Sequence, residues 1–255
     1  MSTLQRMKNP GRRGVAMVAS LLLAWCAYAQ GAPIRIGAED DWAPFSSVQN
    51  GQLHGMAVDL VQAIFAEAGI PLELVPLPYA RCMEEARRGR LAGCFDTLPD
   101  AALRKDFLFH ARPLFIDEIW ILGPVASTEN RLKTADLAGR RVIVTHGYTY
   151  GDAFEGNPGI ERVRAPHDIN ALRMLVAGRA EFAVVYRRIT RHLERSSALD
   201  LRGQFKPVGK LEDAALYLSF SRQSPGAQAL VHRFDEAHAR LRANGVLQKI
   251  EKRWN

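Results

Sequence analysis

The stretch MAVDLVQAIFAEAGIPLELVPL, residues 56–77, decides the fold of this chain. From Met56 to Ala68 the apolar residues recur at helical spacing, and Gly69 follows where a left-handed C-cap is favoured. Leu72–Leu77 is then a short run of strand type. A helix that leads straight into a buried strand indicates a β-α-β unit, and therefore a parallel sheet covered by helices.

The same succession of strands and helices continues on both sides of this stretch. In a first set we expect strands at Ile34–Ala38, Leu72–Leu77 and Leu91–Phe95, and helices at Met56–Ala68 and Arg81–Arg88. In a second set we expect strands at Val142–Thr145, Ile160–Val163 and Phe182–Tyr186, and a helix at Asp168–Ala177. Two sets of the same build predict two lobes.

Two longer segments are predicted to connect these lobes. Leu114–Leu122 is too long and too apolar for a surface linker, so we interpret it as a crossing strand, with a second crossing near Phe205–Leu211. A strand at Leu216–Phe220 and two helices within Gly226–Trp254 then return to the first lobe. We therefore predict an α/β fold of two Rossmann-like lobes joined by two crossing strands, with a ligand cleft between them. Lobe 1 is expected at residues 30–118 and 211–255, and lobe 2 at residues 119–210.

The N-terminus predicts export. Four basic residues precede an apolar run that begins at Val15, and the run is followed by Ala27-Tyr28-Ala29, so we expect a secretory signal peptide cleaved after Ala29. The apolar stretch is shorter than the roughly 20 residues that a membrane-spanning helix needs. A lipid anchor on Cys26 would need a small residue before it, and Trp25 stands there. We therefore expect a soluble periplasmic protein.

Charge and motifs exclude several classes of partner. The net charge is +7, and loss of the four basic residues of the signal peptide leaves +3. No run of Lys and Arg remains, so a nucleic-acid partner is not expected. The sequence has no HExxH, GxSxG or Walker motif and no metal-spaced His/Cys set, so we expect no cofactor, no metal and no catalytic residues. We expect a monomer.

Two cysteines remain after the signal peptide. Cys82 and Cys94 are separated by a short loop, and an oxidising compartment favours their pairing. Such a short closure would contribute about 3 kcal/mol in the loop-entropy model. The alternative is two buried thiols that act as small hydrophobes.

Several short motifs, in order over nearly the whole mature chain, resemble one protein family. They are Asp41–Phe45, Gly51, Gly55, Val58–Leu60, Leu137–Val142 with Gly147, Leu175–Arg179 and Gly245–Trp254. The chain resembles the bacterial extracellular solute-binding proteins of family 3, which serve ABC-type uptake of polar amino acids and related compounds. The resemblance implies a type II periplasmic binding fold that closes on a small polar solute.

The resemblance places the first ligand-binding residues at strand ends in lobe 1. Trp42 is expected at the cleft wall, where its indole can stack on a planar or cationic group, as a partly exposed platform rather than a core residue. Glu39 could meet a ligand cation or cap a turn. Asp96 and Thr97 are expected to face the cleft, although an Asx-type turn into Leu98 would explain Asp96 equally well.

An arginine clamp on a ligand carboxylate has two candidates. Relatives that bind amino acids have such an arginine three residues after a Thr, but here Asp100 stands three residues after Thr97, and Arg104 follows only after seven. Arg104 could still reach the cleft through a longer loop. Arg81 opens the second helix, as in one subgroup of the family. Either residue could instead be a surface charge.

In lobe 2 the resemblance points to a loop and a strand end. The loop residues His146, Tyr148 and Thr149 precede an expected helix start, so backbone N–H groups and the Thr149 hydroxyl could receive a carboxylate, or Thr149 could cap its own helix. Tyr186 stands where amino-acid binders typically have an aspartate for the ligand's α-ammonium. This departure argues against an ordinary L-α-amino acid held in the usual way.

Three functions follow as alternatives. The leading expectation is a periplasmic protein that closes on a small polar solute, either amino-acid-like or a small organic acid, and delivers it to an inner-membrane ABC permease. The second is a dehydratase on the same fold, with Glu39, Asp96 or Glu181 as its acid. The third is a sensory module that docks to a membrane receptor.

Overall fold

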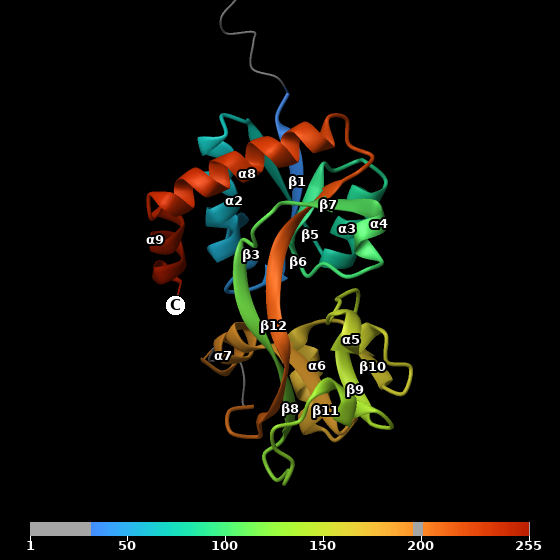
Figure 1. Ribbon diagram of the computed structural model, residues 1–255. Helices are drawn as coiled ribbons and strands as arrows, with labels where there is room; N and C mark the ends of the chain where they lie inside the picture. The colour runs from blue at the N-terminus through green and yellow to red at the C-terminus, as the bar shows by residue number, and fades with distance from the viewer. Residues whose placement is uncertain (1–31, 196–200, 255) are drawn as a thin grey trace, which may run out of the picture. The chain divides into compact units, whose positions relative to one another are not determined.

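The apolar runs of the sequence assemble into one mixed sheet (Figure 1). In the computed structural model, which describes residues 32–195 and 201–254, the strand order is β10-β9-β11-β8-β12-β6-β1-β5, and β7 pairs with β12. The strands are β1 (Ile34–Glu39), β5 (Leu72–Leu77), β6 (Gly93–Thr97), β7 (Phe107–Phe109), β8 (Phe115–Pro124), β9 (Arg141–Thr145), β10 (Glu161–Ala165), β11 (Phe182–Tyr186) and β12 (Phe205–Ser221). As the β-α-β pattern predicts, β1 is parallel to β5 and β6, and β9 is parallel to β10 and β11.

The strands β8 and β12 join the two halves of the sheet. They pair antiparallel from Phe205, opposite Pro124, to Leu216, opposite Phe115. The predicted crossing and the strand expected after it are therefore parts of one continuous strand, β12. The fold is α/β with two Rossmann-like lobes, in which lobe 1 holds β1, β5, β6 and β7 and lobe 2 holds β9, β10 and β11. The boundaries at 118/119 and 210/211 stay a prediction, because β8 and β12 run through them without a break.

The described residues form eight α-helices and one short 3-10 helix. They are α2 (Met56–Glu67), α3 (Tyr79–Arg87), α4 (Leu103–Asp106), α5 (Asp152–Glu155), α6 (Asp168–Val176), α7 (Arg187–Arg195), α8 (Ala227–Ala243), α9 (Val246–Arg253) and the short 3-10 helix η2 (Thr134–Leu137). The C-terminal helices α8 and α9 pack against α2 of lobe 1, as expected (Figure 1). The apolar face of α2, which includes Leu60 and Ile64, is completely buried.

Two predicted boundaries are wrong in ways that affect the site. The helix α3 begins at Tyr79 rather than Arg81, because Pro78, with φ fixed at −54°, directly precedes it. The strand β6 begins at Gly93 rather than Leu91, because the N–H of Leu91 still bonds to the carbonyl of Glu85 at the end of α3. The strand β6 also ends two residues later than predicted, at Thr97 rather than Phe95.

Some elements were not predicted. Between β1 and α2 the chain forms a three-stranded antiparallel sheet of β2 (Asp41–Trp42), β3 (Ser46–Gln49) and β4 (Gln52–His54). The helix α7 directly follows β11 and has only two apolar residues, Ile189 and Leu193. The predicted signal peptide lies outside the described residues. In residues 32–195 and 201–254, no helix is both long and apolar enough to cross a membrane.

A disulfide joins Cys82 of α3 to Cys94 of β6, with 6.0 Å between their Cα atoms, which confirms the predicted pair. Both residues are completely buried. Residue 37 of β1 must be glycine, because a Cβ there would lie 2.2 Å from the Cys82 Sγ. The disulfide therefore packs directly against β1, the strand that ends at Glu39.

Candidate functional site

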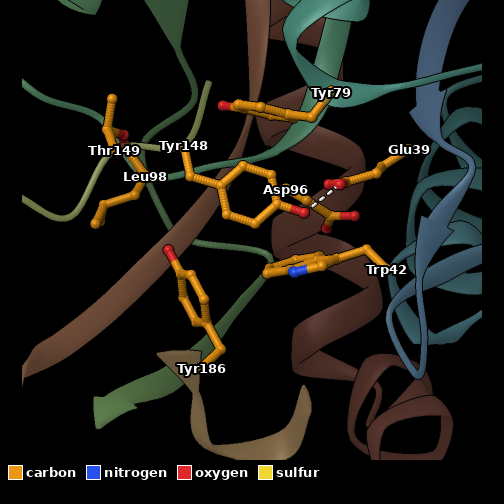
Figure 2. Close-up of a pocket in the computed structure, with 8 residues that line it drawn as sticks. All are labelled: Glu39, Trp42, Tyr79, Asp96, Leu98, Tyr148, Thr149 and Tyr186. Carbon is orange, nitrogen blue, oxygen red and sulfur yellow. Dashed lines mark hydrogen bonds between the residues drawn. The ribbon is translucent and has the colours of Figure 1, made fainter. Parts of the chain in front are cut away.

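A small pocket lies where strands of both lobes end (Figure 2). Its lining residues are Glu39, Trp42, Tyr79, Asp96, Leu98, Tyr148, Thr149 and Tyr186. Glu39 ends β1, Asp96 lies near the end of β6, and Tyr186 ends β11. The carboxyl ends of parallel strands in open α/β sheets are the usual position of ligands.

Aromatic rings form the walls of the pocket. The Tyr148 ring stands edge-on to Trp42, with 6.0 Å between centroids, and edge-on to Tyr79, at 5.4 Å. Tyr186 also meets the indole edge-on, at 5.0 Å. Trp42 is 2% exposed, so the partly exposed platform expected from the sequence is wrong, although the indole does line the pocket. Aromatic faces attract cations through their quadrupole.

Asp96 is the most unusual group of the pocket. Its side chain is buried, and neither carboxyl oxygen has a hydrogen-bond partner among the described residues, so it forms no Asx turn. Its φ is +66°, a left-handed conformation that costs free energy for a residue other than glycine. Burial raises the pKa of Asp96 well above its usual range, because the charged form is desolvated. A buried acceptor with no donor is expensive, and a ligand that donates to it would recover that free energy.

Glu39 is the second buried acid. Its side chain accepts a hydrogen bond from the Tyr148 hydroxyl, which crosses from lobe 2 to lobe 1 (Figure 2). Burial raises the pKa of Glu39 well above its usual range, the Tyr148 hydrogen bond opposes this, and the nearby charge of Asp96 raises it further. The two acids therefore lie close enough to repel each other when both are ionised.

Asp168 supports the site from lobe 2 and was not predicted as a site residue. Its Oδ2 accepts from the Trp42 Nε1–H at 3.2 Å, and its Oδ1 accepts from the Thr145 hydroxyl at 2.5 Å. Burial raises the pKa of Asp168 to about 6, against the lowering effect of these two hydrogen bonds. Its place directly at the start of a predicted helix was the one sequence signal that could have identified it, because acids favour helix N-termini.

Further contacts join the lobes beside the pocket. The Thr149 hydroxyl donates to the Leu98 carbonyl at 3.1 Å, and the Ala101 N–H donates to the Asp152 carboxylate at 2.9 Å. Thr149 does not cap a helix, because α5 begins only at Asp152. Gly147 packs so closely on lobe 1 that a Cβ there would lie 2.7 Å from the Cβ of Ala80.

Four predicted site residues lie outside the pocket lining. Arg81 and Arg104 are exposed, and the Arg104 guanidinium stacks on Phe109 at 5.5 Å. His146 is exposed and lines a different hollow of lobe 2. The Thr97 hydroxyl is completely buried inside lobe 1, where it donates to the Cys94 carbonyl at 3.3 Å. The pocket thus brings together six of the ten predicted ligand-binding residues, which are Glu39, Trp42, Asp96, Tyr148, Thr149 and Tyr186.

The pocket is acidic and aromatic. Its lining includes two carboxyl groups and four aromatic rings, but no Arg, Lys or His. In the part of the chain that the structure describes, no group of three or more His, Cys, Asp or Glu residues could hold a metal ion. Sequence reasoning missed two lining residues, Tyr79 and Leu98. Tyr79 is the first residue of α3, which begins earlier than predicted, and Leu98 directly follows β6, which ends later than predicted.

Comparisons with known proteins agree with this geometry. Residues 34–255 match the family described as bacterial extracellular solute-binding proteins, family 3. A protein of Vibrio harveyi, "Putative amino-acid ABC transporter-binding protein PatH", is 20% identical to the chain over 93% of it and 94% of that protein.

Solved structures show the same fold. A histidine kinase sensor domain with similarity to periplasmic binding proteins has a TM-score of 0.77 and 23% identity, over 88% of this chain and 96% of that one. An ancestral arginine-binding protein bound to arginine has a TM-score of 0.73 and 19% identity, over 88% and 99%. The arginine-, lysine-, histidine-binding protein ArtJ of Geobacillus stearothermophilus has a TM-score of 0.73 and 18% identity, over 88% and 95%. The family match covers nearly the whole described chain, so the protein belongs to the bacterial extracellular solute-binding proteins, family 3.

Proposed function

We propose that this protein binds a small cationic solute in the periplasm and delivers it to an ABC uptake transporter. The observation that carries the proposal is the Asp96 carboxyl group, buried in the pocket with neither oxygen hydrogen-bonded among the described residues. A ligand ammonium or guanidinium would supply the missing donors. The solute-binding family and the solved arginine-binding relatives support the same direction.

The rest of the pocket suits a cation as well. Glu39 adds a second negative group at the same end of the cavity, and the Trp42 indole is held in place by its hydrogen bond to Asp168. A cation over an indole face gains about 0.5–2 kcal/mol, with the higher value in desolvated sites. The Tyr148 hydroxyl of lobe 2 donates to the Glu39 carboxylate of lobe 1. A bound cation would therefore either compete with this hydroxyl for Glu39 or lie beneath the Tyr148 ring. Binding is therefore coupled to how the lobes close.

The dehydratase alternative has one observation in its favour, because a buried acid with a raised pKa is the device such an enzyme needs, and Glu39 and Asp96 both qualify. Glu181, the third acid considered, is exposed and paired with Arg140 at 2.6 Å, outside the pocket. The substrates of such an enzyme, prephenate or arogenate, carry carboxylates, and the pocket lining offers no basic side chain to receive them. We propose binding without catalysis; formation of an aromatic product from either compound, seen by absorbance, would contradict this.

The sensory alternative is favoured by the likeness to a histidine kinase sensor domain. A solute-binding protein that feeds a transporter and one that informs a receptor use the same pocket, so they differ in the membrane partner. Crosslinking of the ligand-loaded protein in native membranes would capture an ABC permease under the transport proposal. Capture of a receptor kinase alone would replace delivery with sensing and leave the ligand proposal intact.

The proposed cationic ligand can be tested by identifying the molecule that co-purifies with the protein and by comparing how different solutes stabilise it. Native mass spectrometry of the freshly purified protein, with release of bound molecules, should yield a small cation. A thermal-shift screen should show stabilisation by amines and guanidines and none by organic acids of the same size. A tightly bound anion would overturn the proposal.

A further inference from the structure

We infer that the preferred ligand is an amine or guanidine without a carboxylate group. The inference rests on the proposed cation binding and narrows it, because neither candidate arginine lines the pocket and most backbone donors of the lobe 2 loop are already bonded. The evidence concerns the arginine clamp, the loop of lobe 2 and the charge of the pocket itself.

The expected arginine clamp is absent from the pocket. Arg81 is exposed in the first turn of α3, although its neighbour Tyr79 does line the pocket. Arg104 is exposed on α4, where its guanidinium lies over the Phe109 ring and its backbone carbonyl accepts a hydrogen bond from Arg222 at 3.2 Å. Without a guanidinium at the pocket, a buried carboxylate would lose its strongest partner.

The loop of lobe 2 has already used most of its donors. Backbone N–H groups at four of its six positions donate within lobe 2: Thr145 to the Tyr150 hydroxyl at 2.8 Å, His146 to the Ala165 carbonyl at 2.8 Å, Tyr148 to the Thr145 carbonyl at 3.3 Å, and Tyr150 to the Glu155 carboxylate at 2.9 Å. The Thr149 hydroxyl donates to the Leu98 carbonyl. The helix that follows, α5, has four residues and contributes little dipole to an anion. Of this loop, only the backbone N–H groups of Gly147 and Thr149 have no printed acceptor, so the expected carboxylate seat keeps at most two backbone donors.

The charge of the pocket acts against a carboxylate directly. Asp96 and Glu39 face the same small cavity. The other polar side-chain groups of its lining are neutral: the Trp42 indole N–H and the hydroxyls of Tyr79, Tyr148, Thr149 and Tyr186. A ligand carboxylate placed there would meet two acids in a desolvated site, where like charges repel strongly. A ligand ammonium or guanidinium alone meets two acceptors and the aromatic walls. The same pocket therefore favours the cation and penalises the zwitterion.

Matched ligand pairs test this inference. Agmatine differs from arginine, and cadaverine from lysine, only by the absence of the carboxylate, so calorimetry with the mature protein isolates the effect of that group. We expect each decarboxylated ligand to bind at least about tenfold more tightly than its amino acid, with the amino-acid methyl esters recovering much of the difference because they keep the bulk and lose the charge.

The outcomes separate the inference from the proposed function. Equal or tighter binding of arginine or lysine overturns the inference and leaves cation binding in place. Methyl esters that bind as weakly as the free amino acids would also overturn it, because size and not charge would then explain the discrimination. If none of these cations binds while a neutral or anionic solute does, the proposed function fails as well.

Discussion

Replacing Asp96 by asparagine should stabilise the protein and weaken its ligand binding at the same time. The carboxyl group is buried without a partner, so at neutral pH the folded protein either holds an unpaired charge or binds a proton that the unfolded chain does not bind. Each unit by which the pKa is raised corresponds to about 1.4 kcal/mol. The asparagine amide is also buried without a partner, so the substitution removes only part of this free-energy cost. We expect the free energy of unfolding to rise by about 1–2 kcal/mol at pH 7.

The raised pKa of Asp96 determines how this stabilisation depends on pH. Above the ordinary pKa of 3.8, the folded state holds more protons than the unfolded state, so stability falls as pH rises through the folded pKa of Asp96. The stabilisation by Asp96→Asn should therefore be small near pH 4 and grow toward neutral pH. For a protein of this size, 1–2 kcal/mol corresponds to a rise in Tm of roughly 2–8 °C.

The same substitution should cost ligand affinity. A hydrogen bond to a charged acceptor contributes about 1.5–3 kcal/mol, so a cation that binds Asp96 should bind the asparagine variant roughly 10- to 150-fold more weakly. Asp213→Asn is the matched control, because Asp213 is exposed and pairs with Lys210 at the surface. It should change Tm and affinity little, since exposed pairs contribute about 0–1 kcal/mol. An Asp96→Asn protein that is less stable than wild type, or that binds agmatine equally well, would refute this reasoning.

Three further measurements probe other parts of the structure. Because Asp168 has a pKa raised to about 6 and accepts from the Trp42 indole, Trp42 fluorescence should titrate with a midpoint near pH 6 and cease to do so in Asp168→Asn; a midpoint below 4.5 would contradict the buried pair. Burial lowers the pKa of His238 from 6.5 to about 4, so the contribution of His238 to the free energy of unfolding should fall as pH drops from 6.5 toward 4, by up to about 3 kcal/mol. The stability difference between the wild type and His238→Gln should therefore change over this pH range, and a difference that does not depend on pH would contradict the prediction. Replacing both Cys82 and Cys94 by serine should lower the free energy of unfolding by about 3 kcal/mol, and the denatured wild type should show no titratable thiol from this pair.

The sequence predicted the fold well because periodicity reports which side chains are buried. Leu72–Leu77 and Phe182–Tyr186 are strands with the predicted ends, since both runs lie between sharp turn signals. The crossing strand β8 was recognised by the apolar length of Leu114–Leu122. The helix α7 was missed because it is short and has only two apolar residues, Ile189 and Leu193, although they stand at helical spacing.

The candidate site was predicted only in part, because pocket membership depends on register and on contacts between distant segments. Trp42, Glu39 and Asp96 follow from their places at strand ends. Tyr79 enters the pocket because α3 begins two residues earlier than its apolar pattern suggested. Asp168 is joined to Trp42 across 126 positions of sequence, a pairing that no local pattern reveals.

Proton release on ligand binding is the measurement that tests the central claim most directly. If a cation is held by the Glu39 and Asp96 carboxylates, whose pKa values are raised by burial, its binding must favour their ionised forms and expel protons. Calorimetric titration of agmatine at a series of pH values from 4 to 8, in buffers with different ionisation enthalpies, should therefore show net proton release within that range, and Asp96→Asn should reduce it. Binding without any proton release, or with proton uptake, in both proteins would contradict the account.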